Sequence, residues 1–137
     1  MSKLHQLSTL EKRALLHSDD PDKETLLVHA ESFLQDGRLY DALDFFEKTR
    51  DHDGLDRVRD AAVEKGDAGL LAWMDKNNLS EISSDQWIDA GENALKSSKF
   101  KYAARAFRLG GDERRANEVL EEVDQQTPSE KVVREEE

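Results

Sequence analysis

The chain has 137 residues, enough for one domain with a hydrophobic core. Charged residues make up 37% of it, hydrophobic residues 36%, and the formal net charge is -11, so we expect a modest core under a highly charged surface. The absence of cysteine excludes disulfides, thiolate catalysis and cysteine-based zinc sites, and no apolar run approaches the roughly 20 residues of a membrane-spanning helix. The first ten residues lack the apolar stretch of a signal peptide, which favours a cytoplasmic protein.

The first predicted element is a short helix that begins at a capping box. Ser8 and Glu11 have the spacing at which each side chain caps the other's backbone N–H group. A second helix follows, with Asp20 as its N-cap and Pro21 in its first turn. The acidic run around Asp20 could hold a metal ion, but carboxylates at a helix start are far better explained by capping.

Apolar residues at helical spacing continue along the rest of the chain, and a strand-like period of two is absent. Glycine or short polar pairs separate the segments, as at helix ends. Ser83 or Ser84 is expected to cap the helix that carries Trp87, and Asp112 is expected to cap the last helix. The acidic residues 127–137 are expected to be disordered. The predicted helices cover approximately residues 24–36, 39–50, 55–65, 68–74, 85–96, 100–109 and 113–125. The predicted class is therefore all-α.

A repeated pattern is visible within these helices. One copy runs Trp87-x-x-Ala90-Gly91-x-x-Ala94, then Ser98-x-Phe100 and Ala103-x-x-x-Phe107, and an equivalent copy lies 61 residues earlier, from Leu26 to Phe46. This pattern resembles the tetratricopeptide repeat, and an irregular α-solenoid of the vesicle-coat type fits nearly as well. The intervening copy is degenerate because Arg59 and Asp75 depart from the pattern.

The resemblance implies a right-handed superhelix of about three antiparallel hairpins, with an N-terminal helix and a C-terminal capping helix, in one domain over residues 1–126. Small residues would occupy the sites where paired helices approach closely, and aromatic side chains would fill the space around them. These are the small residues Ala30, Ala42, Gly91 and Ala103 and the aromatic residues Phe33, Phe46, Trp87, Phe100 and Phe107.

Tetratricopeptide proteins usually bind peptides in a groove formed by the first helix of each hairpin. Carried over position by position, the groove residues would be Leu27, Glu31, Leu34, Asp53, Asp56, Asp60, Glu64, Asp85, Ile88, Glu92 and Lys96. We call these eleven residues the acidic set. Because most are acidic, a protein or peptide partner with a basic or neutral segment is expected. The alternative is that they form a solvated acidic face.

A second candidate surface is basic. Residues 96–115 carry seven basic and two acidic side chains, and Lys101, Arg105 and Arg108 recur at the spacing of one helix face. This stripe could contact an acidic partner, the chain's own acidic tail or a nucleic acid, although the net charge disfavours general nucleic-acid binding. A solvated face is the simplest alternative.

No pattern indicates catalysis, a cofactor or a metal. The four histidines, His5, His17, His29 and His52, form no i, i+4 pair, and no glycine-rich phosphate loop is present. His29 replaces an apolar residue on a buried helix face, as a core histidine would. We therefore predict a binding module, an adaptor or scaffold that is not an enzyme, and self-association stays open.

Overall fold

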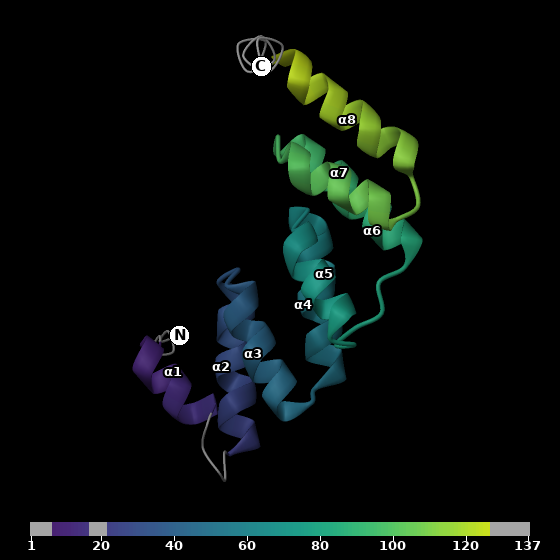
Figure 1. Ribbon diagram of the computed structural model, residues 1–137. Helices are drawn as coiled ribbons and strands as arrows, with labels where there is room; N and C mark the ends of the chain where they lie inside the picture. The colour runs from purple at the N-terminus through teal and green to yellow at the C-terminus, as the bar shows by residue number, and fades with distance from the viewer. Residues whose placement is uncertain (1–6, 17–21, 127–137) are drawn as a thin grey trace. The chain divides into compact units, whose positions relative to one another are not determined.

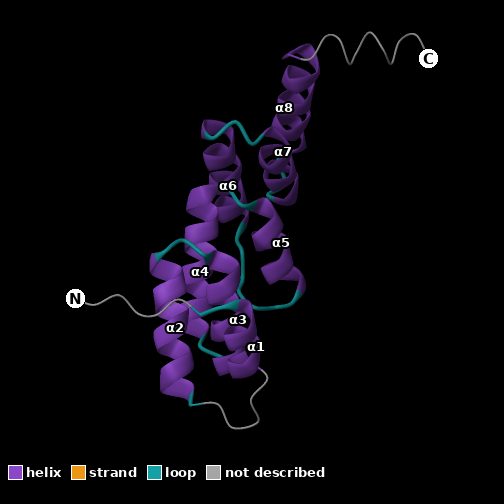
Figure 2. Cartoon of the chain, turned by 90° about the vertical axis from the view of Figure 1, so that its left-hand side faces the viewer, coloured by secondary structure: helices purple, strands orange, loops and turns teal. Residues whose placement is uncertain are grey.

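The computed structural model describes residues 7–16 and 22–126, and within these residues it contains eight α-helices and no strand (Figures 1 and 2). The predicted all-α class is thereby confirmed. The helices are α1 (Thr9–Leu16), α2 (Lys23–Gln35), α3 (Leu39–Thr49), α4 (His52–Lys65), α5 (Ala68–Lys76), α6 (Ser84–Lys96), α7 (Phe100–Leu109) and α8 (Glu113–Gln126). The predicted disorder of residues 127–137 falls outside the described residues.

The chain divides into two compact units, Met1–Asp60 and Ala61–Glu137. The boundary falls within α4, so residues 52–60 belong to the first unit and residues 61–65 to the second. We describe each unit by itself.

In the first unit, α2 and α3 are joined by a short turn at Gly37 and pack side by side as a hairpin (Figure 1). Its centre is apolar: Ala30 and Ala42 are fully buried, and the rings of Phe33 and Phe45 stack with their centroids 5.6 Å apart. The small residues let the two helix backbones approach, and the aromatic rings fill the remaining space, as the repeat pattern predicts.

In the second unit, α7 packs against α6 and also against α8, so that it lies between these two helices (Figures 1 and 2). Gly91 of α6 lies against the fully buried ring of Phe107, and a Cβ atom at Gly91 would stand only 2.7 Å from that ring. Ala94, Ala103, Ala104 and Val119 join Phe107 in the same core, and α5 also packs on α6 and α7. The α6–α7 pair therefore has the predicted small-against-aromatic packing.

The helices from α2 to α7 all end in the same way. Each is followed by one residue in the left-handed conformation, and the next residue's N–H group donates to a carbonyl five positions back, at 2.8–3.0 Å. This is the hydrogen bond of the Schellman motif, which satisfies carbonyls left open at a helix end. The left-handed residues are Gly37, Arg50, Gly66, Asn78, Ser98 and Gly111. Because this turn ends many α-helices in proteins of every fold class, it closes these helices without indicating a particular fold.

Two predicted boundaries were wrong or incomplete. The N-cap of α2 is Asp22, whose carboxylate accepts from the Glu24 N–H group and the Thr25 hydroxyl, whereas the predicted cap Asp20 lies outside the described residues. Helix α4 begins at His52 and includes Gly54, which was predicted as part of a loop. Gly54 is buried against the ring of Phe46, where any side chain would overlap the ring. Packing, rather than a turn, explains this glycine.

The other predicted caps were confirmed. Ser8 and Glu11 form a capping box at α1, and Ser83 forms one with Gln86 at α6. The carboxylate of Asp112 accepts from the Arg115 N–H group at the start of α8. Within the described ranges, no helix is long and apolar enough to cross a membrane.

Candidate interaction surfaces

Six members of the acidic set lie in the first unit. Leu27 and Leu34 of α2 are half-buried, while Asp53 and Asp60 of α4 are exposed. Glu31 and Asp56 are only partly accessible because both carboxylates are engaged by neighbouring arginines. The six residues therefore differ in what each could offer a partner.

Glu31 joins α2 to α4 through a two-pronged ion pair. Nη1 and Nη2 of Arg57 donate to Oε2 and Oε1 of Glu31 at 2.6 and 2.8 Å, and Gln35 donates to Oε1 at 2.9 Å. The hydrogen bonds from Arg57 and then from Gln35 hold the pKa of the Glu31 carboxyl below its usual value. A carboxylate that is already paired with an arginine of its own chain is less available to a cationic group of a binding partner.

Arg59 forms ion pairs with two further members of the acidic set, Asp56 and Asp60. Its guanidinium group contacts Asp56 at 3.4 Å and Asp60 at 3.0 Å, and its side chain is only 17% exposed. In the repeat pattern Arg59 stands where the other copies have Ala30 and Gly91. The residue that departs from the repeat pattern is therefore a cation that pairs with acidic residues of the same helix.

In the second unit, α6 presents an exposed row of charged side chains. Asp85, Asp89, Glu92 and Lys96 are all exposed and follow one another at helical spacing. Asp89 was not among the predicted binding residues, which included its neighbour Ile88. Ile88 is half-buried, and its side chain lies against the backbone position of Gly110 at the corner between α7 and α8.

Two hydrogen bonds join α6 to neighbouring helices beside this row of charged side chains. Nη1 of Arg115 on α8 donates to Oε1 of Glu92 at 3.2 Å, while the same guanidinium group lies 4.2 Å from the centroid of the Phe107 ring. On the other side of α6, Nδ2 of Asn93 donates to the carbonyl oxygen of Val63 at 2.9 Å. Arg115 is therefore a structural cation, and Asn93 positions α6 against the end of α4.

Three carboxylates of the acidic set have no ion-pair or hydrogen-bond partner among the described residues. They are Asp53, Glu64 and Asp85, and all three are exposed. Asp89 has the same properties. These four carboxylates are exposed and unpaired among the described residues, so they are the acidic side chains best able to contact a cationic partner.

The basic stripe lies on the outward face of α7. Lys101, Arg105 and Arg108 are all exposed, and Tyr102 and Leu109 beside them are 45% and 48% exposed. Only Arg108 has an ion-pair partner in the described part of the chain, Glu113 at 3.5 Å. The three cations were predicted as a possible binding stripe, whereas Tyr102 and Leu109 were not among the predicted residues.

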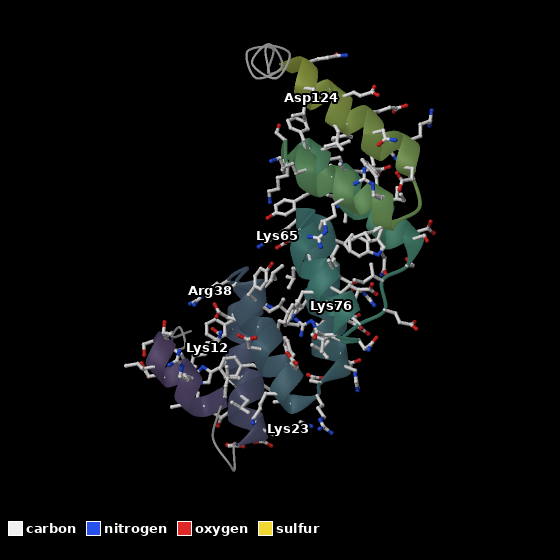
Figure 3. All side chains as sticks on the ribbon, in the orientation of Figure 1. Lys12, Lys23, Arg38, Lys65, Lys76 and Asp124 are labelled. Atoms are coloured by element: carbon white, nitrogen blue, oxygen red, sulfur yellow. The ribbon has the colours of Figure 1, made fainter. Side chains whose placement is uncertain are left out.

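An electrostatic contact also holds α1 in the first unit. Nζ of Lys12 lies 2.7 Å from Asp41 and 2.7 Å from Asp44, both on α3 (Figure 3). No described residue of α1 is fully buried, but Leu15 and Leu16 are half-buried, so this contact holds the helix together with the packing of the two leucines. Burial raises the pKa of Asp41, but hydrogen bonds and charges from Lys12 and Arg38 outweigh that effect and bring the pKa below its usual value.

The histidines do not come together as a metal site in the described residues. His29 is half-buried with its ring 6.3 Å from the ring of Phe45, as expected of a core histidine, and His52 is exposed at the start of α4. Within residues 7–16 and 22–126, no group of three or more histidine, aspartate or glutamate side chains is placed to hold a metal ion. His5 and His17 fall outside these ranges.

A scan against protein-family models gives no match to this sequence, and neither curated proteins nor solved structures match it. The tetratricopeptide resemblance therefore depends on the residue pattern and on the helix packing within each unit.

Proposed function

We propose that this chain is a protein–protein interaction module, an adaptor or scaffold of the tetratricopeptide-like or irregular α-solenoid type. It binds a basic or neutral segment of a protein partner through acidic side chains of α4 and α6. The observation that carries the proposal is the set of exposed, unpaired carboxylates of the second unit, Glu64, Asp85 and Asp89. Helical-repeat proteins commonly use such exposed helix faces to bind protein segments.

The local pairing of the other acidic residues refines this proposal. Glu31, Asp56, Asp60 and Glu92 already have arginine partners, so replacing them would disturb packing as well as any binding. Charge reversal of Asp56 and Asp60 would remove the ion pairs that both carboxylates form with the largely buried Arg59. The unpaired carboxylates are therefore the appropriate targets for a test of binding.

The test compares partner capture by the tagged full chain and by Glu64→Lys/Asp85→Lys. A lysine suits the helix dipole at Glu64, in the last turn of α4, and opposes it at Asp85, in the first turn of α6, so melting curves check the folding of the variant. The matched control is Asp75→Lys/Glu122→Lys, which makes the same charge change at exposed positions on α5 and α8. We expect the recovery of a specific partner to fall about tenfold or more in the first variant and to stay near wild type in the control.

Two outcomes would overturn the proposal at different levels. Equal recovery by all three proteins would contradict binding through the unpaired carboxylates. Recovery of no specific partner by the wild-type chain from its own host would contradict the interaction module itself.

A further inference from the structure

The outward face of α7 combines two kinds of exposed side chain in adjacent rows. With about 100° of rotation per residue, Arg108, Lys101 and Arg105 form one row, and Leu109 and Tyr102 form the next. Together the five side chains cover an arc of about 120° on the helix, opposite the buried Ala103, Ala104, Ala106 and Phe107. We call these five residues the α7 face.

Arg108 lies in the last turn of α7, where a cation is favourable, but the placement of Lys101 does not serve the stability of the helix. Lys99 is the N-cap without a side-chain capping hydrogen bond, Lys101 lies in the first turn, and that turn contains no acidic residue. The N-terminus of a helix favours anions, so these lysines stand where they cost a few tenths of a kcal/mol or more. Every other described helix has an acidic residue in its first turn or, in α5, an aspartate N-cap.

The cations also lack partners that would explain them as a structural network. Among the described residues, no ion pair or hydrogen bond involves the side chain of Lys101 or Arg105, and the contact of Arg108 with Glu113 is long, at 3.5 Å. Arg115 on the neighbouring helix α8 shows the contrast, because it is tied to both Glu92 and the Phe107 ring. Unpaired cations beside exposed tyrosine and leucine are typical of interface residues, among which tyrosine and arginine are enriched.

We propose that the α7 face is a second docking surface, which binds an acidic amphipathic helix of another protein. The partner helix lies along α7 with one row of aspartate or glutamate residues facing Lys101, Arg105 and Arg108. Its adjacent row of leucine or aromatic residues packs on Tyr102 and Leu109. This inference does not depend on the acidic carboxylates of α4 and α6, because it concerns a different surface of opposite charge.

A protein helix fits this face better than a nucleic acid does. The three cations span only about two turns, roughly 10 Å of helix, which would neutralise few phosphates. The adjoining helix α8 exposes Glu121 and Glu122, which would repel a continuing phosphate backbone. A short acidic helix avoids that repulsion and also uses the apolar row.

The experiment selects binders to the immobilised full chain from a displayed library of random peptides of about 16 residues, long enough for four helical turns. We expect the enriched peptides to share three or more acidic residues and a neighbouring apolar row. Their dissociation constants should rise about tenfold or more with Lys101→Glu/Arg105→Glu and also with Tyr102→Ala/Leu109→Ala. All four positions are exposed, and melting curves of the variants check their folding.

The matched control is Lys23→Glu/Lys76→Glu, which makes the same charge change at exposed lysines of α2 and α5. Binding within about twofold of wild type in this control supports a local surface, and an equal loss in both charge variants would overturn it. Enrichment of peptides without the acidic and apolar rows would also overturn the proposal. So would tight binding of a single-stranded oligonucleotide to the α7 face in place of the peptides.

One further variant addresses the chain's own acidic segment. Glu135→Gln/Glu136→Gln/Glu137→Gln in the full chain should leave peptide binding unchanged if the face serves another protein. Binding about tenfold tighter in this variant would show that residues of this chain occupy the α7 face, and would contradict the proposed partner.

Discussion

The guanidinium group of Arg57 on α4 donates to both carboxylate oxygens of Glu31 on α2, at 2.6 and 2.8 Å. This pair joins the start of α4 to the α2–α3 hairpin of the first unit. It also converts a residue expected to contact a partner into one that holds the helices together. The distinction between acidic residues that are paired within the chain and those that are not is central to the proposed binding role.

Glu31→Gln should destabilise the first unit only slightly. The two side chains are 50% and 42% exposed, so the pair is expected to contribute less than about 1 kcal/mol to the free energy of unfolding. Because the pKa of Glu31 is lowered by folding, its contribution is present above the unfolded value of 4.5 and disappears as the pH falls through the lower folded value. A double-mutant cycle with Arg57→Gln, measured at neutral and acidic pH, checks this prediction. Coupling that persists in acid would contradict it.

Lys12→Ala should detach α1 without unfolding the rest of the first unit. The ion pairs to Asp41 and Asp44 help to hold a helix that has no fully buried described residue, so their loss lets α1 unfold locally and gives trypsin access to the backbone at the already exposed Arg13. Lys23→Ala is the control, since Lys23 is exposed at the start of α2 (Figure 3). Cleavage after Arg13 should accelerate in the first variant alone. Equal cleavage of both variants and wild type would show that α1 is held by something else.

The attachment of α1 should depend on pH at both extremes. Burial lowers the pKa of Lys12, but the hydrogen bonds and charges of Asp41 and Asp44 outweigh it, so the folded value is above 10.5. The lysine's contribution is therefore present below 10.5 and is lost as the pH rises through the higher folded value. The contribution of Asp41 is present above 3.8 and is lost as the pH falls through its lower folded value. NMR chemical shifts of α1 should stay constant between these limits and change outside them; a transition at neutral pH would contradict the assignment.

Gly91→Ala should destabilise the second unit by about 1–3 kcal/mol, despite the better helix propensity of alanine. The added Cβ atom would lie 2.7 Å from the fully buried ring of Phe107, which must move. Phe107→Leu provides the control background, because a smaller side chain relieves the overlap. Thermal unfolding should show a smaller cost for Gly91→Ala in that background. The same cost in both backgrounds would exclude the ring as the cause.

Ser98→Gly should stabilise the turn between α6 and α7 by about 0.5–1 kcal/mol. Ser98 has a φ angle of 57°, a conformation that glycine adopts without steric cost. The control is Ser97→Gly, because Ser97 has a φ angle of -98° and gains nothing from glycine. Chemical denaturation of the two variants distinguishes them. Equal midpoints would contradict the proposed strain at residue 98.

Features set by neighbours along the chain could be predicted from the sequence. The all-α class follows from apolar spacing, and the caps at Ser8, Ser83 and Asp112 follow from the chemistry of orphan N–H groups at helix starts. The turns at Gly37 and Gly66 could be predicted because glycine tolerates a positive φ angle. Each of these signals lies within a few residues of the structure that it specifies.

Features set by contacts between helices could not be predicted in the same way. Gly54 was predicted to lie in a loop, whereas it lies in α4. A glycine is needed there because the ring of Phe46, from another helix, occupies the space of a side chain. The pairing of Glu31 with Arg57 joins residues 26 positions apart, and a chain with many charged residues offers too many alternatives to choose among. The α7 face was found only in part, because the exposure of Tyr102 and Leu109 depends on which side of α7 the neighbouring helices cover.

The most direct measurement of the proposed function is calorimetric titration of the full chain with the partner that it captures. Specific binding is predicted, weakened about tenfold or more by Glu64→Lys/Asp85→Lys and by higher salt, and unchanged by Asp75→Lys/Glu122→Lys. A dissociation constant that is the same for the wild-type chain and both variants would contradict binding through the unpaired carboxylates of α4 and α6.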